Sequence, residues 1–194
     1  MNADAVAGGI DPRELDLLSG TVDREGEQIY WELTRTGPDD ERPVVVLSHG
    51  AGGSHAVWYL QIPAIGRHFR TLTWDARGFG NSTNVTESPS PEAAAGDLAA
   101  ILDELAIDRA HLVGQSMGGW HIAAFAIAHP GRVRSLVFAD TIGGLWTDDL
   151  RAAFAEFQAA GGLGGRGQPK VSGHPALWPG TAERDPAHAF LYQA

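Results

Sequence analysis

The stretch His111-Leu112-Val113-Gly114-Gln115-Ser116-Met117-Gly118-Gly119 decides the fold of this chain. Residues 111–113 have strand character and lead into a turn at 114–118 that matches the pattern G-x-S-x-G. A nearly all-apolar helix is predicted over 117–128, buried on most sides, and His129-Pro130-Gly131 stops it. Glycines on both sides of the serine permit a sharp strand-to-helix turn, because glycine adds no Cβ where backbones approach closely. The pattern therefore predicts a serine hydroxyl that points away from the C-terminal edge of a sheet.

The segments on either side repeat the alternation of strand and helix. The run Val44-Val45-Val46-Leu47 is apolar at every position, which is typical of a strand buried on both faces of a parallel sheet. Other strands are predicted at 21–24, 28–34, 71–74 and 135–139, with Glu25-Gly26 as a hairpin turn. Helices are predicted at 55–67, at 91–105 behind the N-cap Ser90, and at 145–160. This order predicts an α/β domain with a mostly parallel sheet.

Composition and charge exclude several classes of function. The chain has 194 residues, 43% of them hydrophobic, which is enough to bury a core. Its 14 basic and 24 acidic residues give a formal charge of −10, which argues against nucleic-acid binding because no basic surface is available for phosphates. The absence of cysteine removes disulfides, zinc–thiolate sites and a cysteine nucleophile. Because the sequence has no apolar run near ~20 residues and no secretory signal, we expect a cytoplasmic protein with no membrane contact.

Ser116 is the candidate nucleophile of the chain. The backbone N–H of Met117 follows it at the start of a helix, where the helix dipole favours a negatively charged oxygen. A second glycine-rich turn, His49-Gly50-Ala51-Gly52-Gly53, follows the strand at 44–47, and we expect the Ala51 N–H to be the other donor to that oxygen. A third turn, Asp75-Ala76-Arg77-Gly78-Phe79-Gly80-Asn81-Ser82, has the pattern D-x-R-G-x-G-x-S.

With these three turns in this order, the chain resembles the α/β-hydrolase superfamily. The segments Trp58-Tyr59-Leu60-Gln61-Ile62-Pro63 and Trp74-Asp75-Ala76-Arg77-Gly78-Phe79-Gly80 are similar to the carboxylesterase and 3-oxoadipate enol-lactonase branch. The resemblance covers residues 28–144 and implies a three-layer core. It implies hydrolysis of a small-molecule carboxylic ester or lactone through an acyl-enzyme, with no metal or organic cofactor. A serine at this position disfavours the dehalogenases and epoxide hydrolases of this scaffold, which carry aspartate there.

The resemblance also implies an acid and a histidine that follow the nucleophile in the chain. Asp140 is one candidate for the acid, and His174 and His188 are the histidines that come after it. The alternative places both groups beyond position 194, because the family carries them after later strands. We accordingly expect a lead-in at 1–20, the N-terminal part of the core at 21–144, and the start of a helical cap at 145–194. Such a C-terminally truncated chain would leave its last strand as an open apolar edge.

Substrate contacts are expected from residues beside the two glycine-rich turns and from the start of the cap. The predicted set is Gly50, Gly52, His55, Gln115 and Trp146. We interpret His49 as a structural partner in its own turn and expect His121 to face away from the Ser116 hydroxyl. Asp75 and Arg77 could form a catalytic ion pair, but a turn held by hydrogen bonds is the favoured interpretation.

Two other classes of function stay open at this point. A C–C bond hydrolase or a peptidase could use the same fold and the same nucleophile. A non-catalytic ligand-binding protein or an inactive truncated chain would keep the fold without a base. Without that base, Ser116 is an ordinary hydroxyl and a poor nucleophile.

Overall fold

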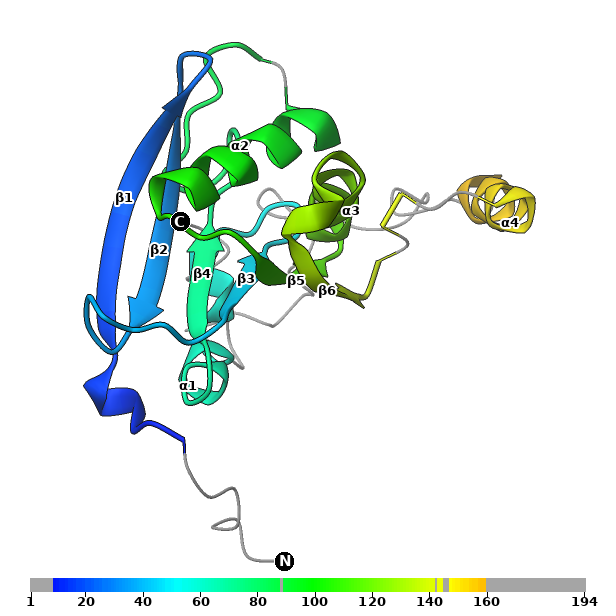
Figure 1. The fold of residues 1–194 in the computed structure, drawn as a ribbon. Helices are drawn as coiled ribbons and strands as arrows, with labels where there is room; N and C mark the ends of the chain where they lie inside the picture. The colour runs from blue at the N-terminus through cyan, green and yellow to red at the C-terminus, as the bar shows by residue number, and fades with distance from the viewer. Residues whose placement is uncertain (1–8, 88, 142, 145–146, 160–194) are drawn as a thin grey trace, which may run out of the picture. The chain divides into compact units, whose positions relative to one another are not determined.

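A computed structural model describes residues 9–87, 89–141, 143–144 and 147–159 (Figure 1). The chain divides after Gly143 into two compact units. The first unit carries a six-stranded sheet with its helices, and the second carries helix α4 (Asp148–Ala159). Trp146 lies outside the described residues, as do His174 and His188.

The sheet has the strand order β1-β2-β4-β3-β5-β6. Its strands are β1 (Asp16–Arg24), β2 (Glu27–Arg35), β3 (Val44–Ser48), β4 (Arg70–Trp74), β5 (Ala110–Gln115) and β6 (Val133–Ala139). Strands β4, β3, β5 and β6 are parallel, whereas the β1–β2 hairpin pairs antiparallel with β4. The prediction of an α/β domain with a mostly parallel sheet is confirmed.

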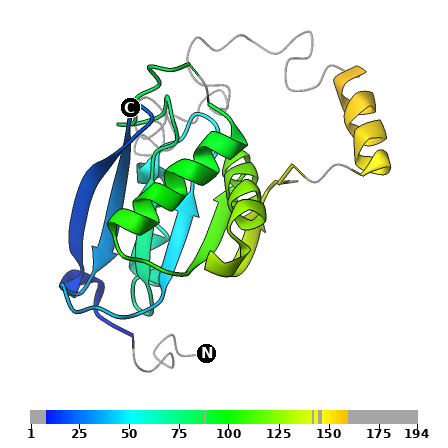
Figure 2. The same cartoon turned by 45° about the horizontal axis from the view of Figure 1, so that its top comes forward.

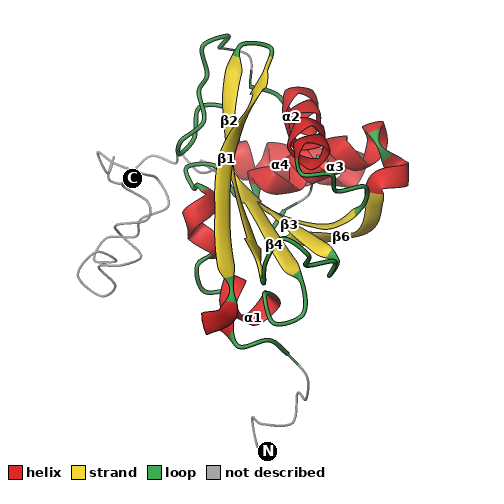
Figure 3. Cartoon of the chain, turned by 60° about the vertical axis from the view of Figure 1, so that its left-hand side comes forward, coloured by secondary structure: helices red, strands yellow, loops and turns green. Residues whose placement is uncertain are grey.

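Helices cover both faces of the sheet. Helices α2 (Pro91–Glu104) and α3 (Met117–Ala128) lie together on one face (Figures 2 and 3). The 3₁₀ helix η2 (His55–Trp58) and the short helix α1 (Ile62–Ile65) pack on the other. Two short 3₁₀ helices, η1 (Pro12–Glu14) and η3 (Pro130–Arg132), lie outside these layers.

Strand β3 is the central strand and is buried on both faces, as its unbroken apolar run predicts. Val44 and Val46 pack into the core shared with α2 and α3. Val45 and Leu47 pack on the opposite face against Trp58 and its neighbours. Successive side chains of a strand point to opposite faces, so one short segment supplies both cores.

The predicted turn and cap signals are confirmed. Glu25 and Gly26 both have positive φ, 58° and 84°, which suits the tight turn between β1 and β2. Helix α2 begins at Pro91, and the Ser90 hydroxyl oxygen accepts the Ala93 N–H at 3.1 Å.

Two boundary predictions were wrong. Strand β1 begins at Asp16 rather than at residue 21, because it pairs with β2 along its whole length while burying little of its own surface. The helix expected at 55–67 is split into η2 and α1, since Pro63 cannot donate a backbone hydrogen bond and stands at the start of a new helix. Helix α3 is buried or half-buried at most of its positions, as predicted, although Ile127 near its end is 82% exposed.

Strand β6 forms one end of the sheet in the described part of the chain. Its apolar side chains are exposed, with Val137 at 50% and Leu136 and Phe138 at 38% each. This agrees with the expectation that the last strand presents an open apolar edge.

Candidate active site

Ser116 lies in a strained turn between β5 and α3. Its backbone has φ 50° and ψ −115°, a combination that non-glycine residues adopt only at a cost. The Ser116 N–H donates to the Ala139 carbonyl oxygen at 3.1 Å, and its own carbonyl oxygen accepts the Gly119 N–H at 3.0 Å. These two hydrogen bonds connect the Ser116 backbone to the end of β6 and to the first turn of α3. They therefore hold Ser116 in its strained conformation.

Glycines make this turn sterically feasible. A Cβ on Gly114 would collide with the Gly118 carbonyl group, and a Cβ on Gly118 would collide with the Ser48 carbonyl group at the end of β3. A Cβ on Gly50 would meet the Gln115 side-chain amide, and would stand 3.2 Å from the Ser116 Cβ. Gly50, Gln115 and Ser116 are thus brought together, as expected of neighbouring site residues.

The turn after β3 (residues 49–54), which we call the oxyanion turn after the role that we predict for it, lies beside Ser116. The Gly53 N–H donates to the Gly50 carbonyl oxygen at 3.0 Å, and Gly52 has φ 75°. Ala51 is exposed at its tip. The donor role that we expect for the Ala51 N–H stays a prediction.

His49 has the structural role that the sequence indicates. Its ring is buried, with Nδ1 2.8 Å from the Gly50 carbonyl oxygen, while Nε2 accepts the Ala76 N–H at 3.1 Å. Burial lowers the pKa of His49, so the neutral ring with its proton on Nδ1 satisfies both contacts. The ring joins the oxyanion turn to the segment after β4.

Met117 is the first residue of α3, where the first backbone N–H groups of a helix have no partner within the helix. Its side chain borders a cavity of about 300 Å³ between the N-terminal ends of α2 and α3. Phe79, Pro91 and Trp120 also line this cavity, whereas Ser116 does not. The cavity therefore borders the residue that follows the serine without being lined by Ser116 itself.

His55 is held by carboxylates, a role that the sequence analysis did not foresee. Its ring Nδ1 lies 2.9 Å from Oδ2 of Asp75, and its backbone N–H donates to Oδ1 of the same residue at 2.5 Å. Its ring Nε2 is 3.4 Å from Oε1 of Glu32 on β2. His55 remains a proposed rather than an observed substrate contact.

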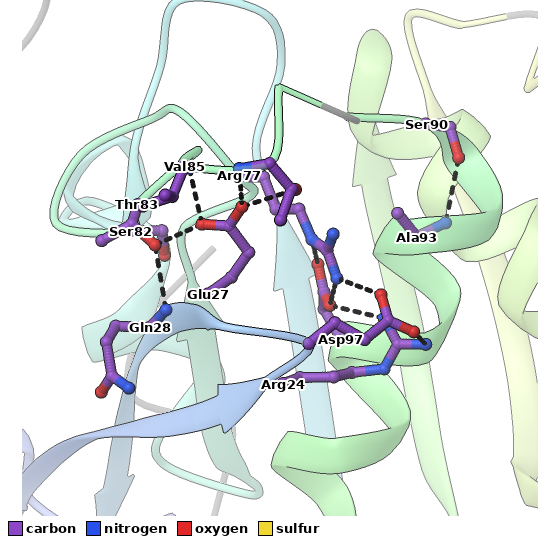
Figure 4. A network of polar contacts seen from close by, with 12 residues as sticks. Arg24, Glu27, Gln28, Arg77, Ser82, Thr83, Val85, Ser90, Ala93 and Asp97 are labelled. Carbon is purple, nitrogen blue, oxygen red and sulfur yellow. Dashed lines mark hydrogen bonds and ion pairs between the residues drawn. The ribbon is translucent and has the colours of Figure 1, made fainter.

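Asp75 and Arg77 do not pair with each other, so the catalytic ion pair that we considered finds no support. Asp75 binds His55, whereas Arg77 donates two hydrogen bonds of 2.8 Å to the carboxylate of Asp97 on α2. Arg24 also reaches Asp97, at 3.1 Å, and Glu25 lies 3.1 Å from Arg77 (Figure 4). This buried network fastens the β1–β2 hairpin and the turn after β4 to α2.

Asp97 is a residue that the sequence reading missed, although a signal was present. It stands three residues after Ala94 and four before Ile101, on the apolar stripe of its helix. A carboxylate on a buried stripe requires a buried cationic partner.

Glu27 forms a second buried carboxylate site at the start of β2. It accepts the backbone N–H groups of Val85 and Thr86 at 3.0 and 2.7 Å and the hydroxyls of Thr83 and Thr86 (Figure 4). These donors lower the pKa of Glu27 to about 2. The loop after β4 is thereby fixed to the hairpin.

Asp140 follows β6 at the sheet edge that carries Ser116. It is exposed and has φ 50°. His121 faces the core, with its Nδ1 3.2 Å from the Ser48 hydroxyl, and burial lowers its pKa to about 4. His121 is thus bound within the core through Ser48, and its orientation away from the Ser116 hydroxyl stays a prediction.

The described residues provide neither a metal site nor a membrane-spanning helix. Within those ranges, no group of three or more histidine, aspartate or glutamate side chains is placed to hold a metal ion. No helix in the same part of the chain is both long enough and apolar enough to cross a membrane.

Comparison with protein families gives a match over residues 43–161 to the model described as alpha/beta hydrolase fold. A protein of a Caulobacter species named "Putative carbamate hydrolase RutD" is 40% identical over 122 residues, which are 62% of this chain and 44% of that protein. The 3-oxoadipate enol-lactonase 1 of Acinetobacter baylyi is 33% identical over 142 residues, 73% of this chain and 52% of the relative. The chain spans about half the length of these curated relatives.

Two solved structures with a similar fold also carry hydrolase and enol-lactonase names. A hydrolase from Pseudomonas aeruginosa has a TM-score of 0.63 at 28% identity, covering 99% of this chain and 66% of that one. The enol-lactonase from Burkholderia xenovorans has a TM-score of 0.58 at 26% identity, covering 74% of this chain and 55% of that one.

Proposed function

Because the chain belongs to the α/β hydrolase fold family, we propose that it hydrolyses a carboxylic ester or lactone through an acyl-enzyme on Ser116. The observation that carries the proposal is the backbone of Ser116, a serine kept at φ 50° between a strand and a helix. Strain of this kind persists at sites where the surrounding structure enforces a functional conformation.

The proposed chemistry begins with attack of the Ser116 oxygen on the substrate carbonyl carbon while a base removes the hydroxyl proton. The backbone N–H groups of Ala51 and Met117 bind the negatively charged oxygen that forms. Collapse of the tetrahedral intermediate breaks the bond to the alcohol oxygen, which takes the proton back from the base. Water then attacks the acyl-enzyme in the same manner and releases the acid. For a lactone, the alcohol and the acid are parts of one product.

The described residues include our candidate for the acid but not our candidates for the base. Asp140 is our candidate for the acid within the described residues, since it follows the strand whose last carbonyl accepts the Ser116 N–H. The buried histidines near the serine turn have other partners: His49 binds Gly50 and Ala76, and His121 binds Ser48. Neither is therefore our candidate for the base. The candidates His174 and His188 lie outside the described residues.

Labelling with a fluorophosphonate tests the proposal, because this reagent phosphonylates only an activated serine. We expect the adduct on the peptide that contains Ser116, and none in Ser116→Ala. Ser135→Ala, a change in an exposed serine of β6, is the matched control and should label like the unchanged chain. Labelling that survives in Ser116→Ala, or an unchanged chain that does not label, contradicts the proposal.

Hydrolysis of a carbamate is a second candidate, and the 40% identity to the RutD relative favours it. The same serine and donors would act, but the bond that breaks is to nitrogen or to the carbamate oxygen. Matched p-nitrophenyl acetate, γ-butyrolactone and carbamate substrates distinguish the two. A higher kcat/KM for the ester and lactone supports the first candidate, and a higher value for the carbamate supports the second.

A further inference from the structure

His55 joins the oxyanion turn to two strands at once. It is the first residue of η2, directly after the turn, and its ring lies between a carboxylate from the end of β4 and one from β2. Asp75 is fully buried, while the side chains of His55 and Glu32 are 16% and 19% exposed. The ring therefore lies in a mostly dehydrated site where charge interactions are strong.

Both ring nitrogens of His55 face an acceptor. Nδ1 is 3.0 and 2.9 Å from the two oxygens of Asp75, and Nε2 is 3.4 Å from Glu32. A neutral imidazole has one N–H and one lone pair, so it would leave a lone pair facing a carboxylate. Only the imidazolium carries a proton on both nitrogens, so only the imidazolium is attracted to both carboxylates.

Tyr30 and His49 are the other titratable groups packed near the ring. The Tyr30 hydroxyl donates to the same Glu32 oxygen at 2.8 Å, and its ring centroid is 4.9 Å from that of His55. His49 is the nearest other titratable cation, and its buried ring is neutral. Burial lowers the pKa of His55, but the hydrogen bond to Asp75 and the charges of Asp75 and Glu32 outweigh burial and raise it.

Asp75 connects this ring to two turns that border the serine. It accepts the backbone N–H of His55 at 2.5 Å and that of Asn81 at 2.8 Å. A Cβ on Gly80 would collide with its carboxylate, so the turn after β4 is folded closely around it. Movement of the His55 ring would therefore be transmitted to the backbone at the end of the oxyanion turn.

We propose that His55 is a positioning residue: as an imidazolium between Asp75 and Glu32 it fixes the oxyanion turn, and with it the Ala51 N–H. The inference rests on the proposed function, in which Ala51 binds the carbonyl oxygen of the substrate. Loss of the proton removes the attraction to Glu32 and loosens the turn. A group whose pKa is raised in the folded state stabilises the fold fully at low pH, and this contribution is lost as the pH rises through the raised value.

The test measures fluorophosphonate labelling rates of Ser116 across pH for the unchanged chain and three variants. In the unchanged chain, the rate should fall on the alkaline side as His55 loses its proton. His55→Gln should label roughly 10-fold more slowly, a smaller effect than the ~10²–10³-fold loss caused by removal of a whole oxyanion donor. The labelling rate of this variant should not decrease on the alkaline side. In Glu32→Gln, which keeps the Tyr30 contact, the fall should move to lower pH. His68→Gln, at an exposed histidine, should match the unchanged chain.

NMR supplies a readout that does not depend on catalysis. The ring nitrogens of His55 should titrate above the ordinary histidine value, and the amide signals of Gly52 and Gly53 should shift with the same midpoint. A chain that fails to label but shows this shared midpoint contradicts the proposed function and retains the positioning role. The positioning role is overturned if His55→Gln labels at the unchanged rate. It is also overturned if the amide signals of the two glycines do not shift as His55 titrates.

Discussion

The carbonyl oxygen of Ala139 accepts the N–H of Ser116 at 3.1 Å, so the end of β6 is bonded directly to the serine turn. The next residue is Asp140, which shares with Ser116 a φ of 50°. The neighbouring strands β5 and β6 are thus each followed by a polar residue whose backbone conformation costs free energy. This relationship makes Asp140 the first carboxylate to test as the partner of a catalytic histidine.

Asp140→Asn should reduce kcat by about 10⁴-fold if Asp140 orients the catalytic histidine, because the amide stabilises the wrong tautomer of the ring. The measurement is steady-state hydrolysis of p-nitrophenyl acetate. Asp108→Asn, in an exposed loop, is the control. An unchanged kcat in Asp140→Asn assigns the acid to another carboxylate.

Ser116→Gly should stabilise the fold while it abolishes labelling. Glycine adopts a positive φ without strain, and relief of about 1–3 kcal/mol exceeds the added entropy of the unfolded chain, about 0.5–1 kcal/mol. Urea unfolding should therefore show a gain of about 1 kcal/mol. Ser135→Gly, in strand β6, has no such strain to relieve and should lose stability. Equal losses in both variants would show that the Ser116 turn is not strained.

Gly118→Ala should destabilise the fold by about 1–3 kcal/mol, because the new Cβ would collide with backbone carbonyl groups of Ser48 and His49. Backbone at the end of a central strand cannot move aside as a flexible side chain can. Gly131→Ala offers the matched comparison, since a Cβ there meets nothing within 4 Å and should change stability by about 0.5 kcal/mol or less. Thermal unfolding of both variants measures the difference.

Glu27 should make the fold sensitive to acid. Hydrogen bonds from Thr83 and Thr86 lower its pKa from 4.5 to about 2, so its contribution is fully present above about pH 4.5 and is lost as the pH falls toward 2. Glu27→Gln should be less stable at pH 7 and should lose less stability over that acid range. The quantity to compare is the difference in unfolding free energy between the two proteins at each pH. Parallel curves for Glu27→Gln and the unchanged chain would contradict this assignment.

Asp97→Asn should cost about 3–5 kcal/mol of stability, because it removes the buried carboxylate that both Arg24 and Arg77 contact. Asp103→Asn, which breaks an ion pair whose carboxylate is 69% exposed, should have little effect. Urea midpoints of the two variants give the comparison. A small loss in Asp97→Asn would mean that the network is well hydrated.

The parts of the fold that sequence could predict are those governed by local rules. Ser90 and Pro91 specify a helix start by themselves, and the glycines around Ser116 predict a close turn that the structure confirms. The predicted start of strand β1 was five residues too late. Strand β1 is an edge strand that is held by its pairing with β2 and buries little of its own surface. Its hydrophobic pattern is correspondingly weak.

The contacts of His55 and Asp97 could not be predicted in the same way. His55 and Asp75 are 20 residues apart, and Arg24 and Asp97 are 73 apart. Partners at such distances are chosen by the packing of whole elements, and one sequence without its fold does not reveal them. Asp97 was detectable as a charge on an apolar stripe, but its two arginines were not.

The position of β3 between β4 and β5 in the sheet has a consequence for the synthesis of the protein on the ribosome. Both strands that flank β3 come later in the chain, and 61 residues separate its end at Ser48 from the start of β5 at Ala110. At ~5–20 residues per second, the nascent chain carries this most apolar strand with an unpaired edge for roughly 3–12 s. Val44 to Leu47 are a short β-prone run without charge, the kind of segment that aggregates while exposed. Arg42 and Pro43 precede it immediately, and a charged residue and a proline are the residue types that oppose strand pairing beside such a segment.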